Sequence, residues 1–198
     1  MDDAPKIKRA VTREEAEAAV KVLIEWAGDD PEREGLRDTP SRVARSYAQL
    51  YSGYQEDPRD YLKRTFEETG GYDELVVMTN IRVVSACEHH MLPVVGKAHI
   101  GYLPRDRVVG ISKLARVVNG FARRLQIQEK LTLEIAEAIQ DVLNPYGVGV
   151  VIEAEHSCMT LRGVNTPGSR LSTSRLTGVI RDDPRTRNEF LRAVGAGG

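Results

Sequence analysis

The order of strand and helix patterns after residue 70 is the feature that most restricts the fold of this chain. Residues 74–86 and 94–103 are rich in valine and isoleucine, and polar and apolar residues alternate at 97–102, as in a strand. Two helical patterns follow, and further strand patterns lie at 147–158 and 170–180. Two strands, two helices and two strands favour a small antiparallel sheet with helices on one face, which is an α+β fold.

Each of the two helical patterns has one apolar side. We expect Ser112 to cap the first helix, and Asn144 followed by Pro145 to end the second. The residues predicted to point inward are Leu114, Val117, Val118, Phe121 and Leu125 in the first helix, and Leu131, Ile135, Ala136, Ile139 and Val142 in the second.

The N-terminal part of the chain has helical patterns only. Thr12 and Glu15 have the spacing of a capping box, which predicts a helix over 12–28. Thr39 is expected to cap a second helix, with Pro40 at its first position.

Two shorter patterns complete the chain. Residues 57–66 indicate a short third helix, and 183–194 a closing helix. We therefore divide the sequence into an N-terminal helical segment, residues 1–70, and a sheet domain, residues 71–198.

Composition excludes several classes of protein. The chain has 198 residues, of which 41% are apolar, enough for a real core. The formal net charge is -1, so we expect neither nucleic acid nor an anionic membrane as a partner. The N-terminus lacks the apolar stretch of a signal peptide, and no apolar run approaches the length of a membrane span. These features predict a soluble cytoplasmic protein.

Cysteine and histidine gather in two short segments, CEHHMLP at 87–93 and EAEHSCM at 153–159. The Cys-x-x-His spacing lets Cys87 and His90 converge on one ion. His156 and Cys158 are two apart on the predicted strand, so both should project from the same face. Cys87, His90 and Cys158 would give three ligands and leave one position open, as in catalytic zinc sites. His89 and His156 would then flank the metal.

Other interpretations of these residues remain open. Cys87 and Cys158 could form a disulfide, although thiols stay reduced in the cytoplasm. They could also be two unrelated buried cysteines beside incidental histidines. A closed structural zinc site would use His156 as its fourth ligand. We expect His99, far from both segments in sequence, to be a surface histidine on a strand.

A run of basic residues offers a place for phosphate. Ser112, Lys113 and Arg116 lie at the predicted start of a helix, where free backbone N–H groups favour anions. Arg162 could add another cation. A solvated basic helix face would have the same sequence.

Gln128 and Glu129 precede the second predicted helix. A carboxylate there could accept two parallel hydrogen bonds from guanine, a pattern that adenine cannot supply. Ordinary compensation of the helix dipole is the alternative.

Seven segments together resemble the GTP cyclohydrolase I family, in the family's order and over nearly the whole chain. They are REGLRDTPSRVA, CEHHMLP, GKAHIGYLP, GISKLARVV, RLQIQEKLT, GVGVVIEAEHSCM and LRGV. The resemblance implies zinc bound by Cys87, His90 and Cys158, with His89 and His156 as the acid–base pair. It also implies guanine binding at Gln128 and Glu129, and triphosphate binding at Ser112, Lys113, Arg116 and Arg162.

The resemblance implies a reaction as well. A zinc-activated water would attack C8 of the guanine of GTP, and His89 would protonate N7. C8 would leave as formate, and the opened ribose would rearrange and close to give 7,8-dihydroneopterin triphosphate. His156 would handle protons at the sugar.

The family further implies the tunnelling fold, with 71–198 as the catalytic domain. Subunits would join their sheets into a ring, and two pentameric rings would stack into a homodecamer with active sites where subunits meet. Pairing exposed sheet edges between subunits is physically sensible.

Three places depart from the family pattern. Val94 stands where many relatives have an aromatic residue, and Lys130 where many have arginine. Residues 165–178 differ from the sequence that is most common in the family. The N-terminus is short, so we expect no dedicated regulatory segment.

Two other classes of protein stay open on the sequence. A metal-dependent nucleobase deaminase would use similar ingredients, but its His-x-Glu and Pro-Cys-x-x-Cys signature does not occur. A binding protein of the same fold that had lost catalysis would be expected to lack a ligand or an imidazole. Glycine patterns of Rossmann and P-loop nucleotide sites do not occur.

Overall fold

The computed structural model describes residues 9–67 and 71–195. Contacts between residues divide the chain into two compact units, Met1–Gln49 and Leu50–Gly198. Residues 50–67 therefore group with the sheet and not with the first two helices. The division at 70/71 made from the sequence stays a prediction, and it adjoins residues 68–70, outside the described ones.

The first unit holds helices α1 (Arg13–Trp26) and α2 (Thr39–Leu50). The capping box is confirmed: the Thr12 side chain accepts from the Glu15 backbone N–H, and the Glu15 side chain accepts from the Thr12 backbone. Thr39 is the first helical residue of α2, and not the residue before the helix that we predicted as its cap. The Arg13 guanidinium donates to Ser41 Oγ at 3.0 Å and so links the two helices.

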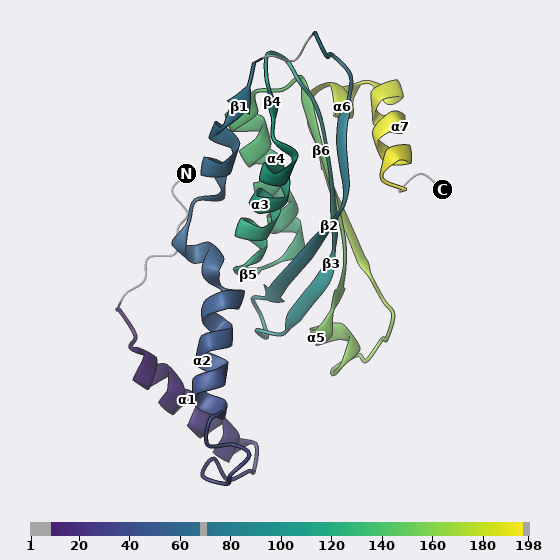
Figure 1. The fold of residues 1–198 in the computed structure, drawn as a ribbon. Helices are drawn as coiled ribbons and strands as arrows, with labels where there is room; N and C mark the ends of the chain where they lie inside the picture. Colours follow the sequence, from purple (N-terminus) through teal and green to yellow (C-terminus); the bar gives the residue numbers. More distant parts are fainter. Residues whose placement is uncertain (1–8, 68–70, 196–198) are drawn as a thin grey trace. The chain divides into compact units, whose positions relative to one another are not determined.

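Five strands form the main sheet of the second unit, in the order β5-β2-β3-β6-β7 (Figure 1). Its long strands are antiparallel. The short β5 runs parallel to the end of β2. The strands are β2 (Val76–Cys87), β3 (Pro93–Leu103), β5 (Leu125–Gln126), β6 (Gly147–His156) and β7 (Leu171–Leu176).

Two helices between the strand pairs, α3 (Ile111–Ala122) and α4 (Gln128–Leu143), cover one face of this sheet (Figure 1). The predicted order of two strands, two helices and two strands is confirmed. Nearly all the predicted inward residues lie in the main core with Ile100 and Tyr102 from β3. Leu125 belongs to β5 and not to the helix, and Val142 is only partly buried.

Two predicted helix starts differ from the structure. The cap of α3 is Gly110, so Ser112 is not the cap and lies inside the first turn. The short third helix, predicted over 57–66, is the 3-10 helix η2 (Pro58–Lys63), with Asp57 as its cap and Pro58 as its first residue. Leu62 of η2 is fully buried in the main core.

Four small elements belong to the same unit. They are η1 (Ser52–Gln55), the paired strands β1 (Thr65–Phe66) and β4 (Val108–Val109), and the single helical turn α5 (Ser157–Thr160).

The opposite face of the sheet is covered at one end by α6 (Gly178–Asp182) and α7 (Pro184–Ala193) (Figure 1). Phe190 of α7 is fully buried over two glycines that face each other across β3 and β6. A Cβ on Gly101 or Gly149 would lie 2.6 Å from the Phe190 ring. Glycine is therefore required at both positions for α7 to pack this closely.

The prediction that His99 lies on the surface is wrong, because its side chain is only 6% exposed. The pairing of β2 with β3 shifts between Met78 and Ile81. At this irregularity the Asn80 backbone N–H donates to His99 Nδ1 at 3.5 Å. The alternation of polar and apolar residues does not reveal such a shift in strand pairing. Here the shift brings the Asn80 backbone next to the His99 imidazole.

Among the described residues, none of the helices has the length and apolar character that a membrane span requires.

Candidate metal centre and surrounding polar site

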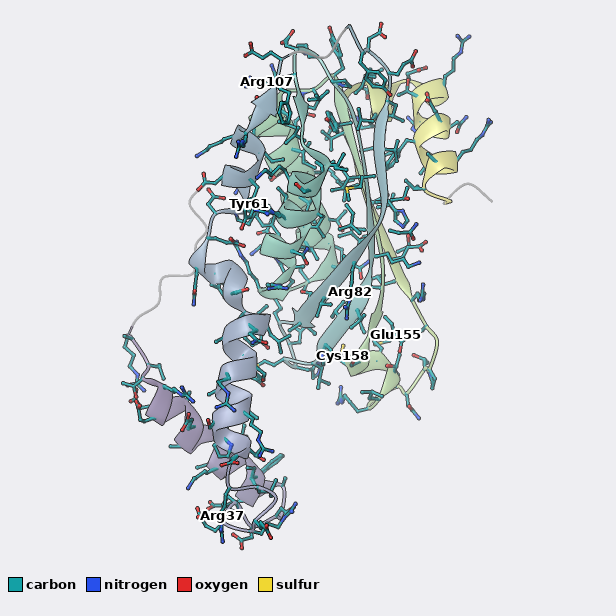
Figure 2. The ribbon with its side chains drawn as sticks, in the orientation of Figure 1. Arg37, Tyr61, Arg82, Arg107, Glu155 and Cys158 are labelled. Atoms are coloured by element: carbon teal, nitrogen blue, oxygen red, sulfur yellow. The ribbon has the colours of Figure 1, made fainter. Side chains whose placement is uncertain are left out.

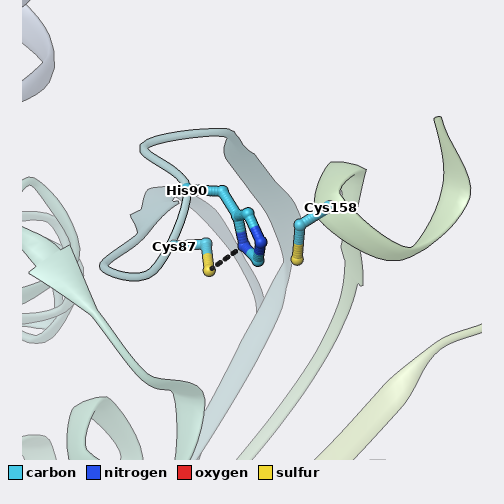
Figure 3. A group of neighbouring side chains, drawn as sticks. All are labelled: Cys87, His90 and Cys158. Atoms are coloured by element: carbon cyan, nitrogen blue, oxygen red, sulfur yellow. Dashed lines mark hydrogen bonds between the residues drawn. The ribbon is translucent and has the colours of Figure 1, made fainter. Parts of the chain in front are cut away.

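Three side chains from two distant segments converge at one end of the sheet (Figure 3). Cys87 ends β2, His90 lies in the turn that follows, and Cys158 lies in α5. Their ligand atoms all lie within 4.8 Å of one another. The structure thus brings together the three residues that the sequence pointed to as metal ligands.

The turn after β2 explains how His90 comes back toward Cys87. The Cys87 backbone N–H donates to Leu92 O at 2.8 Å, and the Met91 N–H donates to Cys87 O at 2.8 Å. Met91 has φ 55, in the left-handed region. This tight turn reverses the chain within a few residues, so the thiol and the imidazole face the same space.

Cys158 reaches the group in a different way from the one predicted. β6 ends at His156, and Cys158 belongs to the helical turn α5, closed by the Leu161 N–H on Ser157 O at 3.0 Å. The expectation that His156 and Cys158 share one strand face is therefore wrong. The helical turn changes the direction of Cys158 relative to His156, and the two side chains have different neighbours.

The donor set fits a borderline-soft divalent cation. Two thiols and one imidazole are the ligands that such ions prefer, and three of them leave a fourth position open. Both cysteines are free thiols here, so a disulfide is not formed. Burial raises the pKa of the Cys158 thiol, and the neighbouring Cys87 adds to this rise. A bound cation would oppose that rise, because it binds the thiolate.

His89 and Arg162 lie beside this group. Nδ1 of His89 and Nδ1 of His90 are each 3.8 Å from Cys87 Sγ. Arg162 Nη1 lies 3.3 Å from His90 Nε2. Because a guanidinium only donates, Nε2 of His90 must be the acceptor in this contact.

His156 lies apart from the three possible ligands and makes a different contact. Its Nε2 is 2.9 Å from Oε1 of Gln128, the first residue of α4. Burial lowers the pKa of His156, and the carboxylate of Glu129 opposes this effect. Gln128 is buried and Glu129 is exposed, so the Glu129 carboxylate is the more accessible of the two to a ligand.

The predicted phosphate residues lie at the other end of α3. Ser112, Lys113 and Arg116 occupy its first turns, whereas its last residue, Ala122, comes just before β5, which pairs with the end of β2. A helix of this length spans roughly 18 Å at 1.5 Å per residue. One chain therefore does not bring these residues to Cys87. The Arg116 guanidinium lies 5.6 Å from the centre of the Tyr61 ring.

Comparisons with known proteins agree with this picture. The family model described as GTP cyclohydrolase I matches residues 16–195. A curated protein named GTP cyclohydrolase 1, from Maricaulis maris (strain MCS10), is 50% identical over 196 residues, which are 97% of this chain and 96% of that protein.

The chain belongs to the GTP cyclohydrolase I family. It has the tunnelling fold of that family, with a curled antiparallel sheet backed by helices. Among solved structures, the crystal structure of the archaeosine synthase QueF-Like in the apo form is similar over 52% of this chain and 93% of that one. The TM-score is 0.42 and the sequence identity 18%.

Sequence reasoning missed the polar side chains around the candidate site of this GTP cyclohydrolase I family member. Thr132 and Thr173 are hydrogen-bonded to each other, and Thr173 accepts from Gln128 Nε2. Gln126 Nε2 donates separately to Phe121 O. A cavity of about 10 Å³ lies there, lined by Ser85, Gln126, Gln128, His156 and five apolar residues. The only available signal was the presence of amide side chains at positions where the helical pattern predicts burial.

Proposed function

We propose that this protein hydrolyses GTP at C8 of the guanine ring, releases formate, and forms 7,8-dihydroneopterin triphosphate. The observation that carries the proposal is the convergence of Cys87, His90 and Cys158 in a chain of the GTP cyclohydrolase I family. We also propose a cytoplasmic location, where these thiols stay reduced.

We propose that Cys87, His90 and Cys158 hold Zn²⁺. When bound by three protein ligands, zinc polarises its substrate and lowers the pKa of a coordinated water toward ~7. His156 is not a fourth ligand in this proposal, because its Nε2 is hydrogen-bonded to Gln128. The open arrangement of a catalytic site is thereby favoured over a closed structural one.

His89 and His156 are proposed as the acid and base on either side of the reacting purine. His89 lies beside Cys87 Sγ, close to where C8 and N7 would stand, so it protonates N7. His156 contacts Gln128 and is influenced by the Glu129 carboxylate, so it is proposed to exchange protons with the sugar. Separate experiments on His89→Ala and His156→Ala, with GTP and with the formylated intermediate, test this division. Loss of the same step in both variants would contradict it.

Arg162 is proposed to leave His90 when the site is loaded. A metal ligand uses the lone pair of one imidazole nitrogen. If Nδ1 of His90 binds the metal, the ring hydrogen is on Nε2. Nε2 then cannot accept a hydrogen bond from Arg162. If Nε2 binds, Arg162 loses its acceptor. In both cases the guanidinium becomes available to the triphosphate of the substrate.

Glu129 is proposed to recognise guanine, with Gln128 beside it. The carboxylate is exposed at the first turn of α4, and it acts electrostatically on His156. Two parallel hydrogen bonds from N1–H and the exocyclic amine would select guanine over adenine. The polar part of the site thus holds the base near the three ligands.

The triphosphate is proposed to bind Ser112, Lys113 and Arg116 of a second copy of the chain, together with Arg162. In one chain the first three lie at the opposite end of α3 from Cys87. β7 pairs only with β6 among the described strands, so its outer edge can pair with another copy. We propose a homodecamer of two pentameric rings, with 71–198 as the catalytic domain and active sites at subunit boundaries.

The experiment that tests this function measures products. Purified protein is incubated with GTP, with and without a chelator, and formate and the fluorescent oxidised pterin are assayed. We expect both products in equal amounts, their loss with chelator, and their return with zinc. ATP serves as the control substrate and should give neither product. Formate release unaffected by the chelator, or no formate from GTP, would contradict the proposal.

A further inference from the structure

We propose that Gln128 is a positioning residue that fixes the orientation of the His156 ring, and the place of its ring hydrogen on Nε2, by accepting a hydrogen bond from it. The use of that proton in catalysis rests on the function proposed above. The position of the proton itself does not, because it follows from the hydrogen bonds of Gln128.

The orientation of the Gln128 amide is set by its neighbours. Nε2 of Gln128 lies 3.0 Å from Ile152 O and 2.9 Å from Leu171 O. Both partners are backbone carbonyls, which only accept, so the amide NH₂ must face them. Rotating the amide by 180° would place its oxygen against two carbonyl oxygens in a buried position, 3% exposed. Oε1 must therefore face His156.

The hydroxyl groups around Gln128 are consistent with this orientation. Thr132 Oγ1 donates to Gln128 O at 2.7 Å, so its hydrogen is used there. Thr173 Oγ1, 2.7 Å from Thr132 Oγ1, must then donate to it. Thr173 Oγ1 is left to accept from Gln128 Nε2 at 3.1 Å. Each of these bonds has one consistent direction, and the network holds the amide rigidly.

The proton on His156 follows from this network. Gln128 Oε1 can only accept, so the contact of 2.9 Å requires a hydrogen on His156 Nε2. Within residues 9–67 and 71–195, Nδ1 of His156 has no hydrogen-bond partner. The contact with Gln128 thus fixes which ring nitrogen of His156 carries the hydrogen, and it holds the ring in one orientation.

The same contacts bear on the expectation that Gln128 binds guanine. Its two amide hydrogens are shared among three acceptors from β6 and β7, and its oxygen accepts from His156. Direct contact with the base would have to break this network. We therefore infer that Glu129 binds guanine directly, and that loss of the Gln128 side chain affects turnover more than substrate binding.

The first measurement is magic-angle-spinning NMR of protein labelled with ¹⁵N-histidine, which suits a large oligomer. Signals of His156 are assigned by their loss in His156→Ala, at a pH where the ring is neutral. We expect the Nε2–H form in the parent protein and a mixture of both forms in Gln128→Met. An Nδ1–H form in the parent would overturn the proposal, and this result does not require Gln128→Met to fold.

The second measurement compares Gln128→Met with Gln126→Met. Gln126 is a matched control, since it is also a buried glutamine that donates to a backbone carbonyl, Phe121 O at 3.0 Å, but within the described residues it has no hydrogen bond to an imidazole. For Gln128→Met we expect kcat to fall about 10²-fold, near the lower end of what proton transfer contributes, with zinc still bound. KM for GTP should change by less than about threefold, and Gln126→Met should keep kcat within about threefold.

Two other outcomes in these variants would overturn the proposal. A rise in KM with unchanged kcat in Gln128→Met would show direct contact with guanine and overturn the proposal. An equal fall of kcat in Gln126→Met would show a general packing effect and also overturn it. If the parent protein releases no formate from GTP, the proposed function fails, but the NMR result still decides the position of the His156 proton.

Discussion

The two ends of the sheet are built for different purposes. At the end near Gly101 and Gly149, helices α3 and α4 pack on one face and Phe190 on the other, so both faces are dry. At the end near Cys87, the apolar cluster consists of only Cys87, Val94 and Ala154, with Cys158 against it.

Among the described residues, no helix packs on the face opposite α3 at this second end (Figure 1). Val95 is 46% exposed, and Arg82 and Glu155 lie on the half of the sheet toward Cys158 (Figure 2). Apolar burial is the main source of stability in folded proteins, whereas uncommitted thiols and imidazoles contribute little to it. We infer that one end mainly stabilises the domain and that the other is the proposed site of the chemistry. Four variants test whether the two ends are independent.

The largest effect is expected at the open end. Cys158→Ser removes one of the three proposed zinc ligands, so the rate of formate release should fall by at least about 10³-fold, since a metal supplies several kcal/mol to such reactions. The metal content of the purified variant should fall with it. Ser157→Ala, one residue away in α5, is the control and should keep both zinc and activity. Normal activity in Cys158→Ser would break the separation.

The next effect is expected at the covered end. Phe190→Ala removes a fully buried ring and leaves a cavity over Gly101 and Gly149, so the free energy of unfolding should fall by about 3–5 kcal/mol. Chemical denaturation measures it, and the folded fraction should keep its zinc. Val164→Ala, at a position 65% exposed, is the control and should change stability little. Loss of zinc from folded Phe190→Ala would show that the two ends are not independent.

A smaller effect concerns the phosphate residues, which one chain keeps apart from Cys87. Arg116→Ala should raise KM for GTP by about 10-fold to 10²-fold, because a charge-assisted contact is lost. Co-assembly of Arg116→Ala chains with Cys158→Ser chains in equal amounts should then restore about a quarter of the parent activity, if each site takes residues from two copies. Mixed oligomers no more active than either variant alone would place all the residues of a site in one chain.

The smallest effect concerns His99, on the face opposite α3 and away from both metal-binding segments. Burial lowers the pKa of His99, an effect that Lys97 on the same strand increases and Glu153 on β6 opposes. The unfolded state therefore binds protons more readily, with a pKa of about 6.5. The stability that depends on neutral His99 is present above this pH and is lost as the pH falls through the lower pKa of the folded state.

The measurement compares the free energy of unfolding of the parent protein and His99→Gln from neutral to mildly acidic pH. We expect the advantage of the parent to shrink on acidification, because glutamine does not titrate. Parallel curves for the two proteins would mean that His99 is not held neutral by burial.

Local signals predicted much of the fold. The Thr12–Glu15 capping box, the alternation in β3 and the apolar sides of α3 and α4 depend on residues that are close in sequence, and all three are confirmed. The convergence of Cys87, His90 and Cys158 was also expected, since their types and spacing suit one ion.

Features that depend on tertiary contacts could not be predicted in the same way. His99 is buried beside a shift in the pairing of β2 and β3, and Cys158 lies in a helical turn that directly follows β6. The contacts of Gln128 join α4 to β6 and β7, which are separated from it by 24 to 45 residues. Neither alternation nor helical periodicity carries information about such pairs.

The central claim is that Cys87, His90 and Cys158 hold a zinc ion on which the hydrolysis of GTP depends. The most direct test removes metal with a chelator, returns zinc in steps, and measures bound zinc and formate release on the same samples. The account predicts a rate that rises in proportion to bound zinc and stops rising when each chain holds one ion. Full formate release by metal-free protein, or a rate unrelated to bound zinc, would contradict it.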